Sequence, residues 1–326
     1  AGDVNNDGCS DILIGAYNYS NGQAGEGVAY LYNGARTGLS TTASWSKEGD
    51  QTGAQYGFSL ASAGDVNGDG YSDVIIGAPG YTVDFSSEGV AVVYLGSPAG
   101  LSASAHWWQS SGQADAHLGY CVASAGDMNG DGYSDIAIGS PYADISAVDD
   151  GIVLVYQGSA AGVSTCMLST GEGHAGALEG YSVASAGDVN GDGYSDLLVA
   201  LPYCNDGEVD EGVVILYYGA AGGFSGGANL QINQAGALFG STVASAGDVN
   251  NDGYSDVIIA APMYDKGQIN EGAVFLYKGS ATGLVTSVSW TAEGNQANAE
   301  FGTAIAGGGD LNGDGYSDII IGAPNF

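Results

Sequence analysis

The chain repeats itself six times, and this internal repetition limits its fold more than any other feature of the sequence. The segment AGDVNGDGYSDVIIGAP, at residues 63–79, recurs with few changes along the chain. The first aspartates of the six copies follow one another at intervals of 60 to 62 residues, at Asp3, Asp65, Asp127, Asp188, Asp248 and Asp310. Such regular self-similarity indicates one supersecondary unit that is copied along the chain and packs against its own neighbours.

Each period reads as four short strands separated by Gly-rich turns. In the second period the candidate strands are FSLASAGD, SDVIIGAPG, EGVAVVYLGS and AHWWQSSGQ. The third is a continuous apolar run, which is typical of a strand buried on both faces. The fourth is the most polar and variable, as expected of an edge strand. Four-stranded units around a channel form a β-propeller, whereas units stacked in a line form a solenoid. The long period favours an all-β β-propeller of four-stranded antiparallel blades.

The number of strands bears on the number of blades. Six copies of the second strand and five of each of the others give 21 strands, which is fewer than a complete ring of six or seven such blades needs. We therefore expect residues 1–326 to form a single propeller domain that is truncated at both ends and belongs to a six- or seven-bladed ring.

The charge of the chain excludes some partners. Its 37 acidic residues against four basic ones give a formal net charge of −33. Four basic residues are too few to neutralise the phosphates of a nucleic acid. An anionic membrane surface would repel it, and no apolar run approaches 18 residues, so direct membrane insertion is not expected. Because 44% of residues are hydrophobic and only 13% are charged, the acidity indicates bound cations or an acidic surface on a folded domain rather than disorder.

Each repeat contains the acidic turn D-x-N-x-D-G-x-x-D, which has the composition of a calcium site. Oxygen side chains at positions 1, 3, 5 and 9 and the backbone carbonyl at position 7 can converge on one ion, and Gly at position 6 permits the sharp turn. Magnesium is the weaker candidate because it requires a tighter octahedron and retains its waters. About six Ca²⁺ per chain are expected. The candidate ligands are Asp3, Asn5, Asp7, Cys9 and Asp11; Asp65, Asn67, Asp69, Tyr71 and Asp73; Asp127, Asn129, Asp131, Tyr133 and Asp135; Asp188, Asn190, Asp192, Tyr194 and Asp196; Asp248, Asn250, Asp252, Tyr254 and Asp256; and Asp310, Asn312, Asp314, Tyr316 and Asp318.

The turn begins like an EF-hand but ends differently. An EF-hand has a bidentate Glu at position 12, where this chain has Ile14, Ile76, Ile138, Val199, Ile259 and Ile321. A turn of the Asp-Gly or Asn-Gly type also forms hairpins without any ion. That simpler interpretation explains the glycine, but not three aspartates and an asparagine within nine residues.

Two further motifs accompany the acidic turn. Tyr56-Gly57, Phe239-Gly240 and Phe301-Gly302 form one, and Gly77-Ala78-Pro79 and Gly322-Ala323-Pro324 form the other. Together with the turn, they resemble the FG-GAP repeat of the integrin α-subunit N-terminal propeller and its bacterial relatives. The resemblance implies a single FG-GAP propeller domain over residues 1–326, located outside the cell or at its surface, with calcium loops on one face and partners on the other. Unlike integrin α subunits, this chain has a complete acidic turn in all six repeats.

An enzymatic function is not expected. His106, His117 and His174 occupy unmatched places in different repeats, and neither a HExxH nor a GxSxG motif in a suitable context occurs. A propeller hydrolase or lyase is a minor alternative. A lectin is a second alternative, because tryptophans lie on the fourth strands. We interpret Trp45, Trp290 and one of the adjacent pair Trp107 and Trp108 as packing between blades, while the other of that pair faces outward.

The segments between the second and third strands differ most from repeat to repeat. They cover residues 16–27, 79–89, 141–151, 202–212 and 262–272 and are rich in Tyr and acidic residues. Variable loops on a repeated scaffold are common binding sites. We expect a protein or glycan partner here, and contacts with other domains or copies of the same longer protein are a further possibility; unselected drift of loop sequence is the plain alternative.

Overall fold

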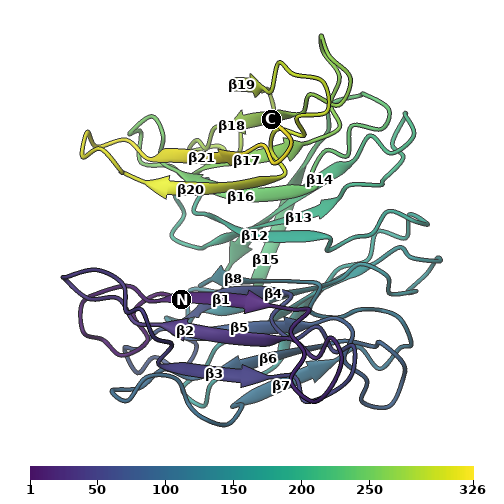
Figure 1. Ribbon diagram of the computed structural model, residues 1–326. Coiled ribbons are helices and arrows are strands. Elements are labelled where there is room, and N and C mark those ends of the chain that lie inside the picture. The colour runs from purple at the N-terminus through teal and green to yellow at the C-terminus, as the bar shows by residue number, and fades with distance from the viewer. The chain divides into compact units, whose positions relative to one another are not determined.

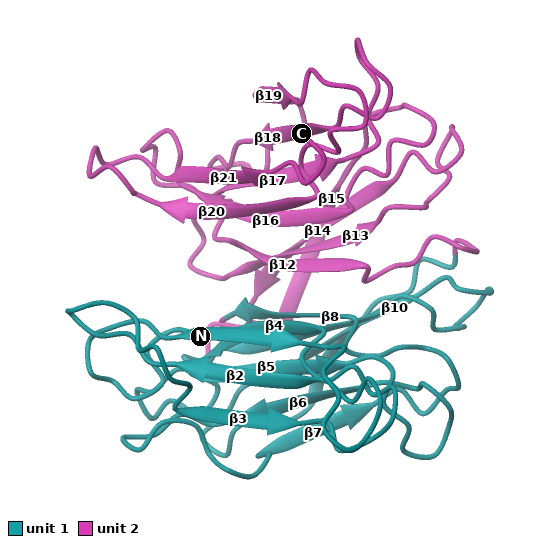
Figure 2. Ribbon diagram, in the orientation of Figure 1, with its two compact units in different colours: residues 1–126, 132–173 teal, residues 127–131, 174–326 magenta.

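The computed structural model describes residues 1–326 and contains 21 β-strands and no helix (Figure 1). The chain accordingly has no helix with the length and apolar character needed to cross a membrane. It divides into two compact units, residues 1–126 with 132–173, and residues 127–131 with 174–326 (Figure 2). Each unit has its own sheets and its own buried apolar clusters.

Unit 1 contains three antiparallel sheets. The first has three strands in the order β1-β2-β3, and the others have four strands each, in the orders β4-β5-β6-β7 and β8-β9-β10-β11. The strands are β1 (Ile12–Ala16), β2 (Val28–Tyr32), β3 (Trp45–Glu48), β4 (Ser59–Gly64), β5 (Asp73–Ala78), β6 (Val90–Tyr94), β7 (Trp107–Ser110), β8 (Cys121–Gly126), β9 (Asp135–Ser140), β10 (Ile152–Tyr156) and β11 (Cys166–Ser169). The first strands of the two complete sheets, β4 and β8, lie side by side.

Unit 2 repeats this arrangement. It has two four-stranded antiparallel sheets, β12-β13-β14-β15 and β16-β17-β18-β19, and the pair β20-β21. The strands are β12 (Ser182–Gly187), β13 (Asp196–Leu201), β14 (Val213–Ala220), β15 (Gly223–Leu230), β16 (Thr242–Gly247), β17 (Asp256–Ala261), β18 (Ala273–Tyr277), β19 (Trp290–Glu293), β20 (Ala304–Gly309) and β21 (Asp318–Gly322). Strand β16 lies beside both β12 and β20.

The strand order confirms the four-stranded blade predicted from the repeats. The second strand of each complete sheet is the apolar run that follows the acidic turn, and every residue of β5, β9, β13 and β17 is buried. The polar fourth strand forms one edge of each complete sheet. The total of 21 strands also agrees with the sequence. The fold is therefore all-β and is built from the antiparallel four-stranded blades of a β-propeller.

Apolar side chains of successive blades pack together within each unit. In unit 1, Leu31 of β2 shares a buried cluster with Ile76 of β5 and Val92 of β6. In unit 2, Leu198 of β13 and Ile259 of β17 belong to another cluster. Each blade therefore buries the face of its neighbour, as expected of a repeated unit that has too few residues to enclose a core alone.

The tryptophans agree with the sequence interpretation in two of three repeats. The Trp45 ring lies 5.0 Å from the ring of Tyr94 in the next repeat, and the Trp107 ring lies 4.8 Å from that of Tyr156. Trp108 is 55% exposed, as strand alternation requires of the second residue of the pair. The prediction for Trp290 was wrong, because its side chain is 43% exposed rather than packed between blades.

The two glycine motifs meet where neighbouring blades approach most closely. A Cβ atom added to Gly77 would lie only 2.0 Å from the carbonyl oxygen of Gly119, which stands in the next repeat at the place of Gly57. Gly119 also has a φ of +82°, which favours glycine, and its N–H donates to the Gly139 carbonyl at 3.0 Å. Both glycines are therefore required by backbone-to-backbone contact between blades.

Candidate metal centres

The six acidic turns share one backbone conformation, which the sequence dictates at two positions. Each turn lies directly before the second strand of its repeat, and in the second repeat it connects β4 to β5. Position 6 is always Gly, with φ of +89° at Gly70. Position 4 is Gly or Asn, with φ of +71° at Gly68 and +56° at Asn6. Glycine adopts positive φ freely and asparagine tolerates it, so these residue types set the shape of the turn.

The aspartate at position 1 is held by backbone donors of its own turn. In the second repeat, Asp65 Oδ1 accepts the N–H groups of Gly68 at 2.7 Å and Asp69 at 3.1 Å, and Oδ2 accepts that of Gly70 at 2.8 Å. The bond from position 5 to position 1 recurs in all six turns, at 3.0 to 3.2 Å. The carboxylate is therefore oriented before any ion binds.

The residues at positions 3 and 5 are oriented in the same way. Asn67 Oδ1 accepts the N–H of Asp69 at 3.1 Å, and Asp69 Oδ1 accepts that of Tyr71 at 3.0 Å. The first of these bonds occurs in all six turns. The two side chains keep further lone pairs that can coordinate a cation, because a carboxylate or amide oxygen accepts more than one contact.

The aspartate at position 9 is the buried member of the set. Asp73 is fully buried, and its two oxygens accept the N–H groups of Val66 at 2.9 Å and Gly96 at 2.8 Å. Burial, together with the charges of Asp69 and Asp65, raises the pKa of Asp73 to about 6 in spite of these bonds. The equivalent Asp196 is also fully buried, and its pKa is likewise raised to about 6 by burial and by neighbouring aspartates.

The third turn is divided between the two units. Within residues 127–131, Asp127 Oδ1 accepts the N–H groups of Gly130 at 2.7 Å and Asp131 at 3.1 Å, as in the other turns. Within unit 1, the buried Asp135 accepts the N–H of Gly158 at 2.9 Å. Each part therefore keeps the geometry of its counterparts.

Successive turns are joined by backbone hydrogen bonds. The N–H at position 8 of one turn donates to the position 1 carbonyl of the preceding turn, as Ser72 does to Asp3 and Ser134 to Asp65, both at 3.0 Å. Three further pairs repeat this bond, from Ser195 to Asp127, Ser255 to Asp188 and Ser317 to Asp248. Each of these turns is therefore attached to the backbone of the preceding turn.

The donor set of the turns fits calcium. The side chains at positions 1, 3, 5 and 9 offer only oxygen, and position 7, including Cys9, would contribute its backbone carbonyl. Hard oxygen ligands suit Ca²⁺, whereas zinc or copper sites use nitrogen or sulfur. The residue types named from the sequence are therefore those of a calcium site, but the structure does not bring the three carboxylates of a turn within 4.8 Å of one another, as it does Glu26, Glu48 and Asp50.

Sequence reasoning missed a second set of carboxylates, at the opposite end of the second strand. Directly before the third strand of five repeats there is a buried acidic residue: Glu26, Glu88, Asp150, Glu211 and Glu271, each no more than 1% exposed. An acidic residue before Gly at the same place in all five repeats was the available signal.

Glu88 illustrates the role of this set. Its Oε1 accepts the N–H groups of Val83, Asp84 and Phe85, and its Oε2 accepts that of Gly112 at 3.1 Å. Burial would raise the pKa of Glu88, but the hydrogen bonds from these four backbone groups outweigh burial and lower it. The Glu88 carboxylate therefore holds the backbone of the variable loop in place.

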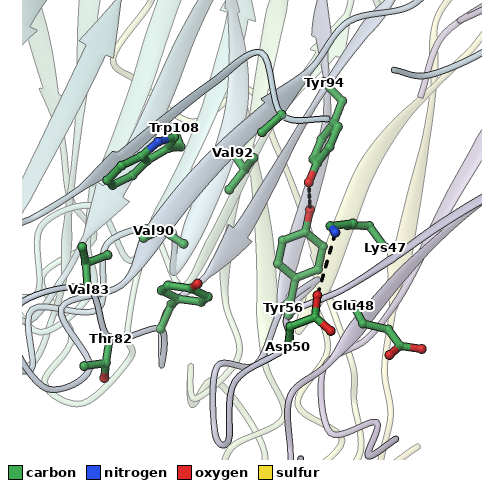
Figure 3. Close-up of a pocket in the computed structure, with 13 residues that line it drawn as sticks. Lys47, Glu48, Asp50, Tyr56, Thr82, Val83, Val90, Val92, Tyr94 and Trp108 are labelled. Carbon is green, nitrogen blue, oxygen red and sulfur yellow. Dashed lines mark hydrogen bonds and ion pairs between the residues drawn. The ribbon is translucent and has the colours of Figure 1, made fainter. Parts of the chain in front are cut away.

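A cavity of about 530 Å³ lies in unit 1 beside the first two blades (Figure 3). Tyr81, Tyr94 and Trp108 supply aromatic surface, and Lys47 and Glu48 supply polar groups. In Figure 3, Trp108 lies on the side of Val90 and Val92, away from Lys47 and Glu48. Such a mixture of exposed aromatic and hydrogen-bonding groups suits a small polar ligand.

Two of the histidines make backbone contacts. The ring nitrogen Nε2 of His106 lies 3.1 Å from the carbonyl oxygen of Ala161, and Nδ1 of His117 lies 2.9 Å from that of Pro79. The His117 ring also packs against Tyr142. These contacts account for both residues as parts of the scaffold.

Comparison with known proteins gives the class to which the chain belongs. The family model described as "FG-GAP repeat" matches residues 1–32, 56–95, 122–156, 180–217, 239–277 and 301–326. These segments contain all six acidic turns and cover more than half of the chain. The chain therefore belongs to the FG-GAP repeat family, as the sequence motifs indicated.

Integrin alpha chains are among its curated relatives. It is 39% identical to Integrin alpha-V of Gallus gallus and 33% identical to Integrin alpha-5 of Xenopus laevis, each over 219 residues, or 64% of this chain and 20% of the relative. Integrin alpha-4 of Xenopus laevis is 36% identical over 165 residues, or 49% of this chain and 16% of the relative. The chain thus spans a fifth or less of the length of these relatives.

Proposed function

We propose that the chain is an extracellular, calcium-binding β-propeller module that serves adhesion or protein interaction and is not an enzyme. The observation that carries the proposal is the set of six acidic turns, which hold oxygen ligands in one repeated backbone frame. The similarity to integrin alpha chains supports the adhesion role. An extracellular location fits, because extracellular calcium modules have dissociation constants of roughly 10⁻⁴–10⁻³ M.

In this proposal each turn holds one calcium ion, about six in all, through its side chains at positions 1, 3, 5 and 9 and its carbonyl at position 7. The ion neutralises three aspartates that otherwise repel one another. Because position 8 of one turn is hydrogen-bonded to position 1 of the preceding turn, calcium stiffens the connection between blades. The calcium face is structural, and the opposite ends of the second strands are free to bind partners.

Replacement of one exposed ligand should remove one calcium ion. Asp69 is exposed, so we expect Asp69→Ala to lower the calcium bound at saturation by one ion per chain and to leave the fold intact. Asp84→Ala is the matched control, since Asp84 is an exposed carboxylate in the variable loop of the same repeat. Equilibrium dialysis with elemental analysis measures the calcium content of both variants. Equal calcium content of the two variants would contradict the assignment of this turn.

We propose the variable loops between the second and third strands as the partner face. Unlike typical surface loops, they expose large apolar side chains at their tips, 41 to 68% accessible: Val83, Phe85, Ile145, Val148, Val209 and Ile269. Exposed apolar groups gathered at the loop tips of a unit often mark an interaction surface. The buried carboxylates beneath the loops hold their backbones in place, which lowers the entropy lost when a partner binds.

An aromatic row runs beside these loops in unit 1. The rings of Tyr17 and Phe58 lie 5.3 Å apart, those of Phe58 and Tyr120 lie 5.0 Å apart, and those of Tyr120 and Tyr142 lie 6.1 Å apart. Aromatic residues are enriched at protein interfaces because they bury a large area at a small cost in conformational entropy. In unit 2, Tyr264 packs on Phe275 at 5.4 Å, so we assign it to the core.

Polar substitution of two loop tips should weaken partner binding without affecting stability. We expect Phe85→Ser combined with Val148→Ser to reduce retention of a calcium-dependent partner at least tenfold in a pull-down from the extracellular fraction of the source. The melting temperature should be unchanged, since both side chains are exposed. Leu39→Ser, 45% exposed in the connection between β2 and β3, is the control. Full retention by the double variant would refute this face assignment.

Glycan binding is a second candidate function, favoured by the cavity in unit 1. Sugars bind through hydrogen bonds to polar groups and through apolar ring faces that stack on aromatic side chains, and Trp108 provides such a side chain at the cavity. We expect Trp108→Ala to abolish any signal of the chain on a glycan array. Trp290→Ala is the matched control, because Trp290 is also an exposed tryptophan of a fourth strand. Equal signals from the two variants would exclude this cavity as the glycan site.

A further inference from the structure

We propose that Glu26, Glu48 and Asp50 form an additional calcium site in the first repeat, separate from the six acidic turns. One carboxylate oxygen of each residue lies within 4.8 Å of the others. Calcium binds oxygen at 2.3–2.6 Å, so two ligands of one ion lie no more than about 5 Å apart. The three oxygens are thus already close enough to share an ion.

The buried member of the cluster carries an unpaired oxygen. Glu26 is fully buried; its Oε1 accepts the N–H of Asn21, whereas its Oε2 is enclosed and accepts no hydrogen bond. A buried carboxylate oxygen without a partner is costly, and two further carboxylates beside it increase the cost. A divalent cation bound here would coordinate this oxygen and would also offset the negative charge of the three carboxylates.

The fifth repeat provides an internal comparison, because a lysine stands beside the equivalent pair of carboxylates. Glu271 and Glu293 occupy the places of Glu26 and Glu48, and the strand registers agree, with Val28 opposite Glu48 and Ala273 opposite Glu293. There the Lys266 ammonium donates to Glu293.

Three substitutions change the charges around these carboxylates. Lys266 stands five residues before Glu271, where the first repeat has Asn21 before Glu26, and Asn295 stands two residues after Glu293, where the first repeat has Asp50 after Glu48. Lys47 stands directly before Glu48, where the fifth repeat has Ala292. Each repeat therefore has one lysine at this place, and the first repeat has one carboxylate more than the fifth.

The second repeat shows what happens when the other carboxylates are absent. Ser110 lies opposite Val90, at the place of Glu48, and both oxygens of Glu88 accept backbone hydrogen bonds. Glu88 therefore needs no cation. Glu211 also has an unpartnered oxygen, but it is not part of a cluster of three carboxylates.

The surroundings of the cluster leave room for an ion. Lys47 Nζ lies 3.8 Å from Asp50 Oδ2, with both side chains substantially exposed, so it offsets only part of the charge (Figure 3). Asn21 Nδ2 lies 3.1 and 3.2 Å from the two Glu48 oxygens. Rotation of this amide would present its Oδ1 to the same place as a further ligand. Glu48 and Asp50 line the cavity of unit 1, through which an ion can enter.

The test transfers the pattern of the fifth repeat to the first. In the full chain, Asn21→Lys combined with Asp50→Asn should bind one calcium ion fewer than wild type at saturation, measured by equilibrium dialysis with calcium alone. The reverse exchange, Lys266→Asn with Asn295→Asp, should gain one ion. If the first variant fails to fold, Glu48→Gln, which keeps size and hydrogen bonding, replaces it with the same expected loss.

The result is independent of the acidic turns. Asp69→Ala should remove the ion of one acidic turn. When it is introduced into both wild type and the Asn21→Lys, Asp50→Asn variant, their calcium contents should still differ by one ion. If the turns bind no calcium but this difference persists, the additional site stands and the proposed role of the turns falls. Equal calcium content and equal affinity in wild type, the first-repeat variant and Glu48→Gln would overturn the additional site.

Discussion

Removal of calcium should lower the melting temperature of the chain by about 15 °C. Each ion that binds only the folded state stabilises it by RT ln(1 + [L]/Kd), which is about 1.4 to 2.7 kcal/mol at 10 to 100 times Kd. About six turns then contribute on the order of 10 kcal/mol. For a chain of 326 residues the entropy of unfolding is about 0.7 kcal/mol/K, so 1 kcal/mol changes the melting temperature by about 1.5 °C.

Calorimetry in 10 mM CaCl₂ and in excess chelator measures this effect. Magnesium at the same concentration is the control for ionic strength, and it should restore little of the loss, since the turns lack the compact octahedral shell that Mg²⁺ requires. The hydrogen bonds from Ser72 to Asp3 and from Ser134 to Asp65 join successive turns, so loss of calcium should also loosen the packing of neighbouring blades. A change of less than about 5 °C would contradict a structural role for the ions.

Removal of the carboxylate beneath one variable loop should strongly destabilise the chain. Glu88→Ala leaves four backbone N–H groups, those of Val83, Asp84, Phe85 and Gly112, without their acceptor. Each unsatisfied donor costs about 1–3 kcal/mol if it stays buried, and water reaches some of them when the loop moves. We expect a loss of about 3 kcal/mol in the free energy of unfolding.

Urea denaturation of Glu88→Ala and of the Asp84→Ala control checks this value. Asp84 is exposed in the same loop, so its loss should change stability by less than about 0.5 kcal/mol. Equal stability of the two variants would show that Glu88 does not hold the loop.

The same carboxylates make stability depend on pH. The folded-state pKa of Glu88 lies below its ordinary value of 4.5, so the folded protein releases this proton more readily than the unfolded chain. The resulting stabilisation is present above pH 4.5 and is lost as the pH falls through the folded pKa. Glu88→Ala should remove this part of the acid sensitivity of the chain.

The repeated strands and turns could be read from the sequence because their determinants are local. A six-residue apolar run such as DVIIGA predicts a buried strand, and β5 is buried throughout. The spacing of oxygen side chains and of Gly70 sets the turn within nine residues. Neither feature depends on contacts with distant parts of the chain.

The features that the sequence did not reveal arise from contacts between distant residues. Glu48 and Asp50 stand next to Glu26 only because β3 pairs with β2. Glu88 looks like an ordinary loop residue until its burial is known. Trp290 was assigned to the core by analogy with Trp45, but its exposure depends on what covers its strand, which the local pattern does not contain.

The number of calcium ions bound to one folded chain tests the central claim most directly. The measurement is best made on the Asn21→Lys, Asp50→Asn variant, in which only the six acidic turns remain as expected sites. Native mass spectrometry after equilibration in millimolar calcium should find about six ions per chain, all released by chelator. A folded chain that holds no calcium under these conditions would contradict the assignment of the turns and the function that we propose from them.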